Sequence, residues 1–234
     1  MKSFRIEPVA ECSVMIQLGT KIDPKFSLHI GHIADAIRYE LMDVIMNVTP
    51  SYTNILVDYL PFLMPEATIL QRLESIVKRE LAHPPTHPAN HIEIPVYYDL
   101  SVGPDLARFS EEKGLTIEQV ISLHSQHTYH VCAMGFAPGF AFLAEVPDEL
   151  VMPRHATPRL SVPAGSVAIA ANQTAVYPES SPGGWNVIGN CPIPLYNPTG
   201  DVISPFSIGD TVSFCPIERD EYEELGGQLW DSLK

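Results

Sequence analysis

The chain has 234 residues, 45% hydrophobic and 18% charged, which is ordinary for a globular protein of one large or two small domains. Its formal net charge of −14 at pH 7 argues against nucleic-acid binding, because that affinity depends on Lys and Arg contacts to phosphate. No run approaches the ~20 apolar residues of a membrane span, the N-terminus lacks the apolar core of a signal peptide, and the four cysteines are scattered, so we expect a cytoplasmic protein with reduced thiols.

The first eighty residues predict alternating strands and helices. Residues 4–18 alternate in polarity, which is typical of a strand, and residues 52–59 alternate in the same way. Residues 29–46 and 68–81 carry apolar side chains every three or four positions, which predicts two amphipathic helices. The order strand, helix, strand, helix predicts a small α/β sandwich over residues 1–82. We expect it to serve as a docking domain, since no catalytic pattern occurs in it.

Residues 83–91 are predicted to form an extended linker, because three of these nine residues are proline. His83, His87 and His91 recur at a spacing that would place them on one face of a helix. The prolines oppose such a helix, so we predict no metal site here.

Residues 92–234 are predicted to form a second domain, which makes the whole chain an α+β protein. Residues 92–96 alternate as a strand, and residues 105–113 read as a short helix closed by Gly114. Thr116 and Gln119 have the spacing of a capping box for another helix. After His127 turns recur every eight to twelve residues between short apolar runs, which favours a closed barrel.

Residues 135–185 contain five glycines and seven prolines, so we expect stiff, shaped loops between short strands. These loops present Arg154 and Arg159, although residues 114–234 contain only four Lys or Arg against 13 Asp or Glu. A guanidinium suits bidentate recognition of a carboxylate or phosphate. The alternative is that one or both arginines pair with local acids at the surface.

A series of motifs follows in order along the second domain. They are Tyr129-x-Val131, GFAPGF at 135–140, PRHATPR at 153–159, VPAGSVAIA at 162–170, QTAVYP at 173–178, SPGGW at 181–185 and GDTVSFCP at 209–216. Together they resemble the family that includes the B subunit of 5-oxoprolinase, the KipI-type histidine-kinase inhibitors and allophanate hydrolase subunit 1. Asn172 and Ala175 stand where glycine is usual in that family, so the branch stays open.

The resemblance implies a cyclophilin-like β-barrel for residues 92–234. It also implies a subunit, inactive alone, of an ATP-dependent 5-oxoprolinase that converts 5-oxo-L-proline (pyroglutamate) to L-glutamate. Two further subunits, of the LamB/YcsF and KipA types, are the expected partners. The resemblance also implies ATP as the cofactor of the complex, and this chain has no P-loop motif that would hold it. The alternatives are an inhibitor that docks on a sensor histidine kinase, and a carboxyltransferase subunit of allophanate or urea metabolism, to which a partner would bring biotin.

The expected site residues come from these motifs. Arg154 and Arg159 are expected to clamp a phosphorylated intermediate. His124 is expected to carry a proton, the alternative being a histidine favoured by a helix dipole, and Gln173 to orient the ligand. No metal is expected, because His124, His127 and His130 cannot share one ligand face. The expected contacts to the small-molecule substrate are Gly135, Phe136, Pro138, Gly139, Phe140, Tyr177, Pro182, Gly183 and Trp185. For Trp185 and the glycines the alternatives are a plug of the barrel end and ordinary turns.

Overall fold

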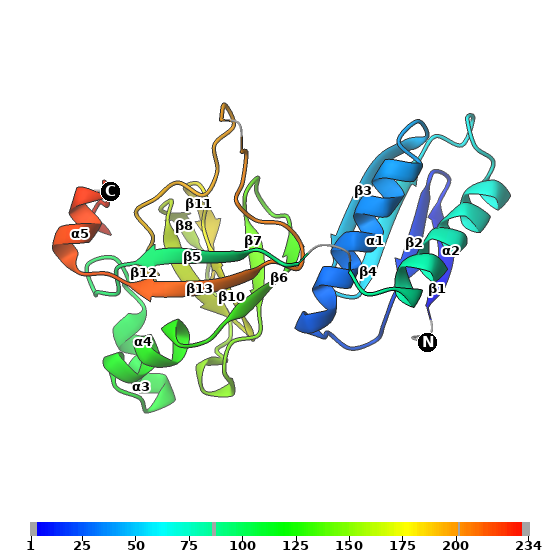
Figure 1. Ribbon diagram of the computed structural model, residues 1–234. Helices are drawn as coiled ribbons and strands as arrows, with labels where there is room; N and C mark the ends of the chain where they lie inside the picture. Colours follow the sequence, from blue (N-terminus) through cyan, green and yellow to red (C-terminus); the bar gives the residue numbers. More distant parts are fainter. Residues whose placement is uncertain (1–3, 86–87, 201, 231–234) are drawn as a thin grey trace. The chain divides into compact units, whose positions relative to one another are not determined.

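The computed structural model describes residues 4–85, 88–200 and 202–230, which divide into two compact units (Figure 1). The first unit extends to Asn90 and also contains Ser207–Asp210, and the second contains His91–Phe206 and the chain from Thr211 onward. The chain therefore passes between the units three times, whereas the predicted boundaries at 82 and 92 allow for one crossing. His87, in the predicted linker, lies outside the described residues.

The first unit is a four-stranded antiparallel sheet with two helices on one face (Figure 1). The strand order is β1-β2-β4-β3. The elements are β1 (Arg5–Ala10), β2 (Ser13–Gln17), the 3-10 turn η1 (Pro24–Phe26), α1 (Ser27–Glu40), β3 (Ile45–Ser51), β4 (Asn54–Tyr59) and α2 (Glu66–Ala82). The apolar side of the sheet and the apolar faces of both helices form one core.

The predicted elements of this unit are partly right. The alternation over residues 52–59 is confirmed as β4, with Ile55, Val57 and Tyr59 buried, and the second helix is confirmed as α2. Residues 4–18 form a hairpin rather than one strand, since β1 and β2 pair with each other. The predicted helix over residues 29–46 is too long.

The helix ends at Glu40 because the chain turns at Leu41. The amides of both Val44 and Ile45 donate to the carbonyl of Leu41, and Ile45 then pairs with Tyr59 as the start of β3. The apolar spacing of three and four residues continues across this turn by coincidence, which conceals β3 in the sequence.

The segment Ser207–Asp210 returns to pack against α1. A side chain at Gly31 would bring its Cβ to 2.6 Å from the carbonyl oxygen of Ile208, and one at Gly209 would bring it to 2.4 Å from Leu28 Cα. Both glycines are therefore required for this close approach. The Asp210 carboxylate fixes the segment, accepting from the amides of Asn90 (3.0 Å) and Ser207 (2.8 Å).

The second unit is mostly strands, as predicted for the chain after His127. Its sheet runs in the order β5-β13-β6-β7-β10-β9-β12, antiparallel except for β5 and β13, and β8 and β11 form a separate ribbon. The strands are β5 (His91–Val96), β6 (Tyr129–Met134), β7 (Ala141–Ala144), β8 (Arg159–Val162), β9 (Ser166–Ala170), β10 (Gln173–Val176), β11 (Ser181–Gly183), β12 (Asn186–Asn190) and β13 (Thr211–Pro216). The helices are α3 (Leu106–Lys113), α4 (Ile117–Ser125), the 3-10 turn η2 (Asp148–Leu150) and α5 (Arg219–Glu224).

The predicted closed barrel is not confirmed. A single bridge between Tyr97 and Asn190 joins the chain just after β5 to the end of β12, so the ladder is incomplete there. The helix signals of this unit are confirmed. Gly114 ends α3 in the left-handed conformation (φ 65°), and Thr116 and Gln119 form both hydrogen bonds of a capping box.

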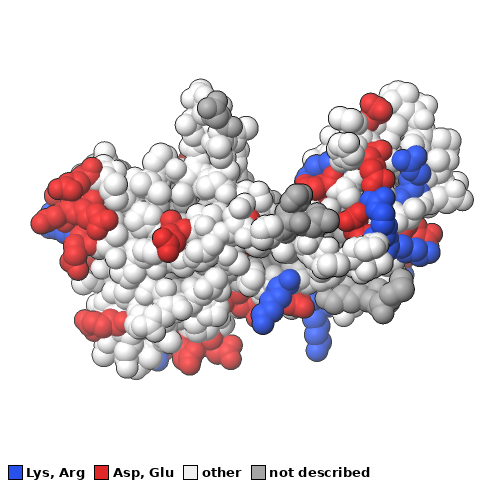
Figure 2. Space-filling model, viewed as in Figure 1, with Lys and Arg blue, Asp and Glu red and all other residues white. Residues whose placement is uncertain are grey.

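Charge on this unit is mostly negative. Figure 2 shows Asp and Glu gathered over α5, whose acids are Asp220, Glu221, Glu223 and Glu224, and few Lys or Arg on the visible face of the second unit. This agrees with the acidic excess counted over residues 114–234.

The close approach before α3 gives a test of the packing. Gly103→Ala would place a Cβ 2.5 Å from the backbone carbon and oxygen of Ile188 in β12, so the backbone must shift. We expect a loss of about 2 kcal/mol or more in the unfolding free energy of the second unit. Both tryptophans, Trp185 and Trp230, belong to that unit, so their fluorescence in a urea titration follows it alone. Gly135→Ala, whose Cβ would meet nothing within 4 Å, is the control, and equal losses in both variants would contradict the packing argument.

Candidate functional site

Two of the predicted motifs, PRHATPR and SPGGW, lie against each other in the second unit. Arg159 at the start of β8 pairs with Gly183 in β11, and the amide of His155 donates to the carbonyl of Gly184 (2.8 Å). The proline-rich loop and the glycine-rich turn are therefore held in one place by backbone hydrogen bonds.

Arg159 is bound to a buried carboxylate. Its Nη1 and Nη2 donate to Asp105 Oδ2 (2.8 Å) and Oδ1 (2.7 Å) in a bidentate pair, and the amide of Val187 donates to the same Oδ2 (2.8 Å). Burial alone would raise the pKa of Asp105, but the hydrogen bonds from Arg159 and Val187 outweigh it, and the pKa lies below its usual value. Asp105 precedes α3 and its side chain caps no helix amide. The sequence position suggested only a helix start, so Asp105 was missed.

His155 and Arg108 complete this group with Asn186. The Nε2 atom of His155 lies 3.1 Å from Asp105 Oδ1 and faces Arg159 Nη1 (3.1 Å) and Arg108 Nη2 (3.3 Å). Arg108 also donates to Asn186 Oδ1. The side-chain nitrogen of Asn186, Nδ2, donates to the carbonyls of Pro153 and Ile169 (both 2.9 Å).

We call these five residues the Asp105 network: Asp105, Arg108, His155, Arg159 and Asn186. Sequence reasoning found only Arg159 among them. His155 lies within the PRHATPR motif, which was the available signal. Arg108 and Asn186 carried none, because within the network Arg108 is 47 residues from His155 and 78 residues from Asn186 along the chain.

Arg154 has a different environment. It is exposed, and its guanidinium carbon lies 5.7 Å from the centre of the Trp185 ring, a cation–π contact. Among the described residues no carboxylate lies within ion-pair distance of it. The alternative of pairing with a local acid therefore holds for Arg159, whose partner is buried, and among the described residues it does not hold for Arg154.

The aromatic residues of the predicted site form one cluster. Phe140 contacts Tyr177 and Trp185 edge-on, with ring centres 5.5 and 5.7 Å apart, and Phe136 contacts Phe140 at 5.1 Å. A Cβ on Gly183 would lie 2.3 Å from the Tyr177 hydroxyl, so only glycine fits there. Phe140, Tyr177 and Trp185 are buried in the core, which favours the plug alternative for Trp185.

The GFAPGF loop is the exposed edge of this cluster. Residues 134–139 line a hollow of about 410 Å³, which includes the expected contacts Gly135, Pro138 and Gly139. Phe136 is 63% exposed and has a left-handed backbone (φ 72°), a conformation that is strained for a bulky residue. Pro182 is exposed on β11.

The charges of both arginines act on the pKa of Tyr177. Burial raises the pKa of Tyr177, and the positive charges of Arg154 and Arg159 act in the opposite direction. Both guanidiniums therefore lie near enough to the Tyr177 hydroxyl to influence it.

His124 lies elsewhere, in a closed hydrogen-bond chain. Thr174 Oγ1 donates its one proton to the carbonyl of Ala168 (3.1 Å), so His124 Nε2 must donate to Thr174 (2.9 Å) and Nδ1 must accept from the Tyr98 hydroxyl (2.7 Å). The ring is 0% exposed and stacks on Phe214. Burial lowers the pKa of His124 to about 3, so the ring is neutral at pH 7. A neutral, enclosed ring gains little from the dipole of α4, and this geometry gives no support to a proton carrier.

Gln173 precedes Thr174, the threonine bonded to His124, in strand β10. It is partly exposed and pairs with Ala144 in β7 and Ala170 in β9. It is therefore fixed by strands on both sides.

Two further kinds of site are absent from the described part of the chain. There, no group of three or more His, Cys, Asp or Glu residues is arranged to hold a metal ion. Across the same residues, no helix is both long and apolar enough to cross a bilayer.

The buried histidine predicts a specific pH dependence. Because the pKa of His124 is about 3 in the folded chain and about 6.5 when unfolded, the unfolded state gains a proton first as the pH falls. The contribution of the buried His124 to the unfolding free energy is therefore fully present above pH 6.5, and it declines by about 1.4 kcal/mol per pH unit below that value. In His124→Gln, tryptophan-monitored urea midpoints should fall less steeply between pH 6.5 and 4.5. His127→Gln, a partly exposed histidine three residues away, should keep the original slope, and a wild-type slope in His124→Gln would contradict the assignment.

The carboxylate of Asp105 gives a second test. Asp105→Asn keeps the size of the side chain but removes the charge that Arg159 needs, so we expect a loss of roughly 2–3 kcal/mol, discounted because Arg159 is partly exposed. Since its pKa is lowered, the loss should be seen at neutral pH and shrink as the pH falls through the pKa of the carboxyl group. Glu112→Gln removes the exposed partner of Arg108 and should change stability by less than about 0.5 kcal/mol. Similar losses of unfolding free energy in both variants would show that the buried ion pair contributes no more to stability than the exposed one.

Proteins of known name and family are similar to this chain over most of its length. The family described as the carboxyltransferase domain, subdomain C and D, matches residues 4–206. A protein of Escherichia coli O157:H7 named as the B subunit of 5-oxoprolinase is 36% identical over 92% of this chain and 97% of its own length. One of the same name from Bacillus subtilis is 32% identical over 94% and 95%. Among solved structures, TTHA0988 is similar with a TM-score of 0.78 and 33% identity over 88% of this chain, which spans 40% of that longer protein. The chain therefore belongs to the carboxyltransferase-domain family, subdomains C and D, as a homologue of the B subunit of 5-oxoprolinase.

Proposed function

We propose that this chain is a subunit of an ATP-dependent 5-oxoprolinase complex that converts 5-oxo-L-proline to L-glutamate. The observation that carries the proposal is the similarity to relatives named as the B subunit of 5-oxoprolinase, which extends over more than nine-tenths of this chain and of theirs. The name of those relatives implies an assembly of several subunits. We propose partners of the LamB/YcsF and KipA types.

The chemistry requires an anion site. The ring of 5-oxoproline is an unstrained amide and a poor electrophile, and transfer of a phosphoryl group to its carbonyl oxygen would make it open to water. The developing charge is stabilised by positioned donors. Arg154 is the proposed donor, because its guanidinium is exposed, has no acid partner among the described residues and rests on Trp185.

Arg159 has a supporting part in this proposal. Its two terminal nitrogens are bound to Asp105, so it acts by holding the 153–159 segment and by its charge rather than as a free clamp. Gln173 is the proposed orienting donor. His124 does not contact the substrate in this proposal and acts indirectly, through its hydrogen bond to Thr174, which follows Gln173 in β10.

The hollow at the GFAPGF loop is the proposed place for the substrate. Gly135, Phe136, Pro138 and Gly139 would contact it directly. Phe140, Tyr177, Gly183 and Trp185 would support that loop from the core, with Pro182 at the rim. The strained, exposed Phe136 supports this choice, since backbone strain collects at ligand contacts.

Four finer points complete the proposal. ATP is bound at the level of the complex. The second unit is a cyclophilin-like barrel, for which the bridge between Tyr97 and Asn190 is the structural support. The first unit is a docking domain. The location is the cytoplasm, in keeping with four cysteines that are all free thiols.

A second candidate is a carboxyltransferase subunit, favoured by the description of the family itself. In that reaction Arg154 would hold a carboxylate, and a partner would bring the carboxylated biotin. The two candidates differ in what the complex consumes, since only the first releases glutamate from 5-oxoproline and ATP.

The test is turnover of the complex, co-purified with its partner subunits and assayed for glutamate release from 5-oxoproline and ATP. Arg154→Met should lower kcat about 100-fold, as for the loss of one anion-stabilising donor, while the melting temperature stays unchanged. Arg219→Met, which removes an arginine paired with Glu223 on α5, is the matched control and should keep full activity.

Three results would count against parts of the proposal. Full activity of Arg154→Met removes the anion clamp but leaves the oxoprolinase. A wild-type complex that releases no glutamate but consumes carboxybiotin favours the second candidate. Co-purification with a sensor kinase alone favours the inhibitor alternative.

A further inference from the structure

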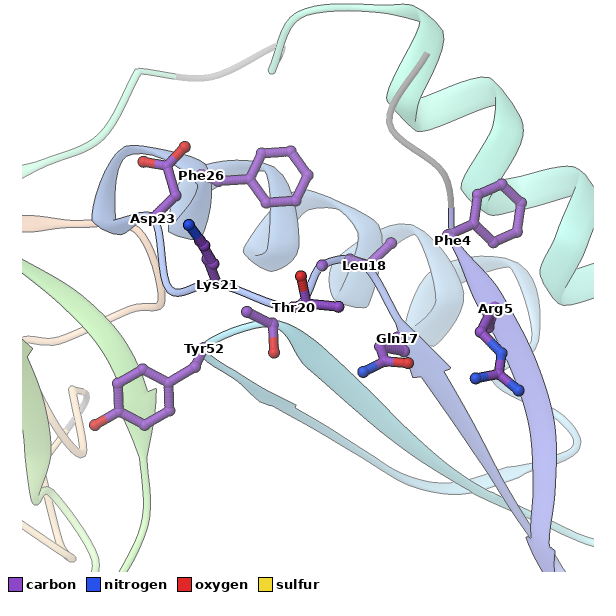
Figure 3. A pocket seen from close by; sticks show the side chains of 11 residues that line it. Phe4, Arg5, Gln17, Leu18, Thr20, Lys21, Asp23, Phe26 and Tyr52 are labelled. Carbon is purple, nitrogen blue, oxygen red and sulfur yellow. The ribbon is translucent and has the colours of Figure 1, made fainter.

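A cavity of about 450 Å³ lies at one end of the first unit, and the described residues that line it all belong to that unit. It lies where β1 begins, where β2 runs into the loop before η1, and at the turn between β3 and β4 (Figure 3). Its volume falls within the range of small-molecule sites. Nothing in the proposed 5-oxoprolinase chemistry uses it.

Aromatic and aliphatic side chains form one part of its wall. Leu18 is 2% exposed and belongs to the core of the first unit, and Phe4 and Phe26 pack against that core while remaining partly exposed. The Phe26 ring is fixed in orientation, because it stacks on His29 with ring centres 5.2 Å apart and planes within 17°. The wall is thus a preformed surface that would suit a flat apolar group.

The charged residues of the wall are mostly engaged elsewhere. The Asp23 carboxylate accepts from the amide of Lys25 (3.2 Å) and so caps η1, and Arg5 pairs with Glu7. Lys21 is different. It is exposed, and no carboxylate of residues 4–85 or of the other described segments lies within ion-pair distance of its ammonium group.

The remaining wall is polar but uncharged, and one residue of it is strained. Gln17, Thr20 and Thr53 offer amide and hydroxyl groups, while the backbone between them is tied by the bond from Leu18 N to Thr53 O (2.7 Å). Tyr52, at the β3–β4 turn, has φ 45°, a left-handed conformation in which a side chain is unfavourable. Such strain persists where surrounding structure enforces it, often next to ligands.

We propose that this cavity binds a small aromatic carboxylate. The ring would lie against Phe4 and Phe26, the acid group would pair with Lys21, and Gln17 and Thr53 would meet polar ring substituents. An ion pair next to an apolar wall is stronger than one in open water, so the acid group should matter to affinity. The inference is independent of the proposed enzyme activity and can fail without it.

The test uses the purified full chain and the fluorescent aromatic anion 8-anilinonaphthalene-1-sulfonate as a reporter. It is displaced either by 1-naphthoate or by 1-naphthalenemethanol, which has the same ring system without the acid group. We expect naphthoate to displace it at an at least tenfold lower concentration than the alcohol. In Lys21→Met this preference should disappear, while Lys25→Met, an exposed lysine four residues away that does not line the cavity, should keep it. Gln17→Phe fills the cavity and should weaken both competitors.

The proposal is overturned if Lys21→Met and Lys25→Met behave alike, or if Gln17→Phe leaves displacement unchanged in a protein that melts as the wild type does. In those cases the reporter binds elsewhere. Retention of naphthoate binding by Arg154→Met would separate this site from the proposed anion site of the second unit, and its loss would show that the two had been confused.

Discussion

The second unit depends on one buried carboxylate. Asp105, only 3% exposed, would be costly to bury without partners, and it receives both terminal nitrogens of Arg159 and the amide of Val187. These contacts connect the start of α3, the start of β8 and strand β12. The loops that carry the family motifs are therefore anchored to the helical part of the unit by a charge that cannot be left unpaired.

The pairing of Asp105 with Arg159 leaves the two arginines, Arg154 and Arg159, in different environments. The guanidinium of Arg159 is occupied by the carboxylate, while that of Arg154 lies over the face of Trp185, which attracts the cation without using its hydrogen-bond donors. The donors of Arg154 therefore stay unpaired with any carboxylate of the described residues, as the proposed anion site requires. Rigid loops around a binding site reduce the motion that is lost on binding.

His155 and His124 lie in different environments. His155 lies at the partly exposed edge of the Asp105 network, where its Nε2 is within 3.3 Å of Asp105, Arg108 and Arg159. His124 is neutral because it is fully buried, and both its nitrogens are used by Tyr98 and Thr174. The residue singled out from the sequence is thus a core group, and the one that was overlooked lies beside the candidate site.

Short-range signals along the chain were enough to predict much of the local structure, and the ordered motifs were enough to predict the family. Apolar periodicity placed α2 and β4, the capping box placed α4, and Gly114 placed the end of α3, because each of these signals acts over a few residues. The same local spacing led to a wrong end for α1, where a turn at Leu41 carries no distinct signal. The return of Ser207–Asp210 to the first unit and the pairing of Asp105 with Arg159, 54 residues away, became visible only in the folded chain. Such partners are chosen by how the chain packs over long separations, and a side chain's charge or hydrogen-bonding capacity does not reveal which distant group will satisfy it.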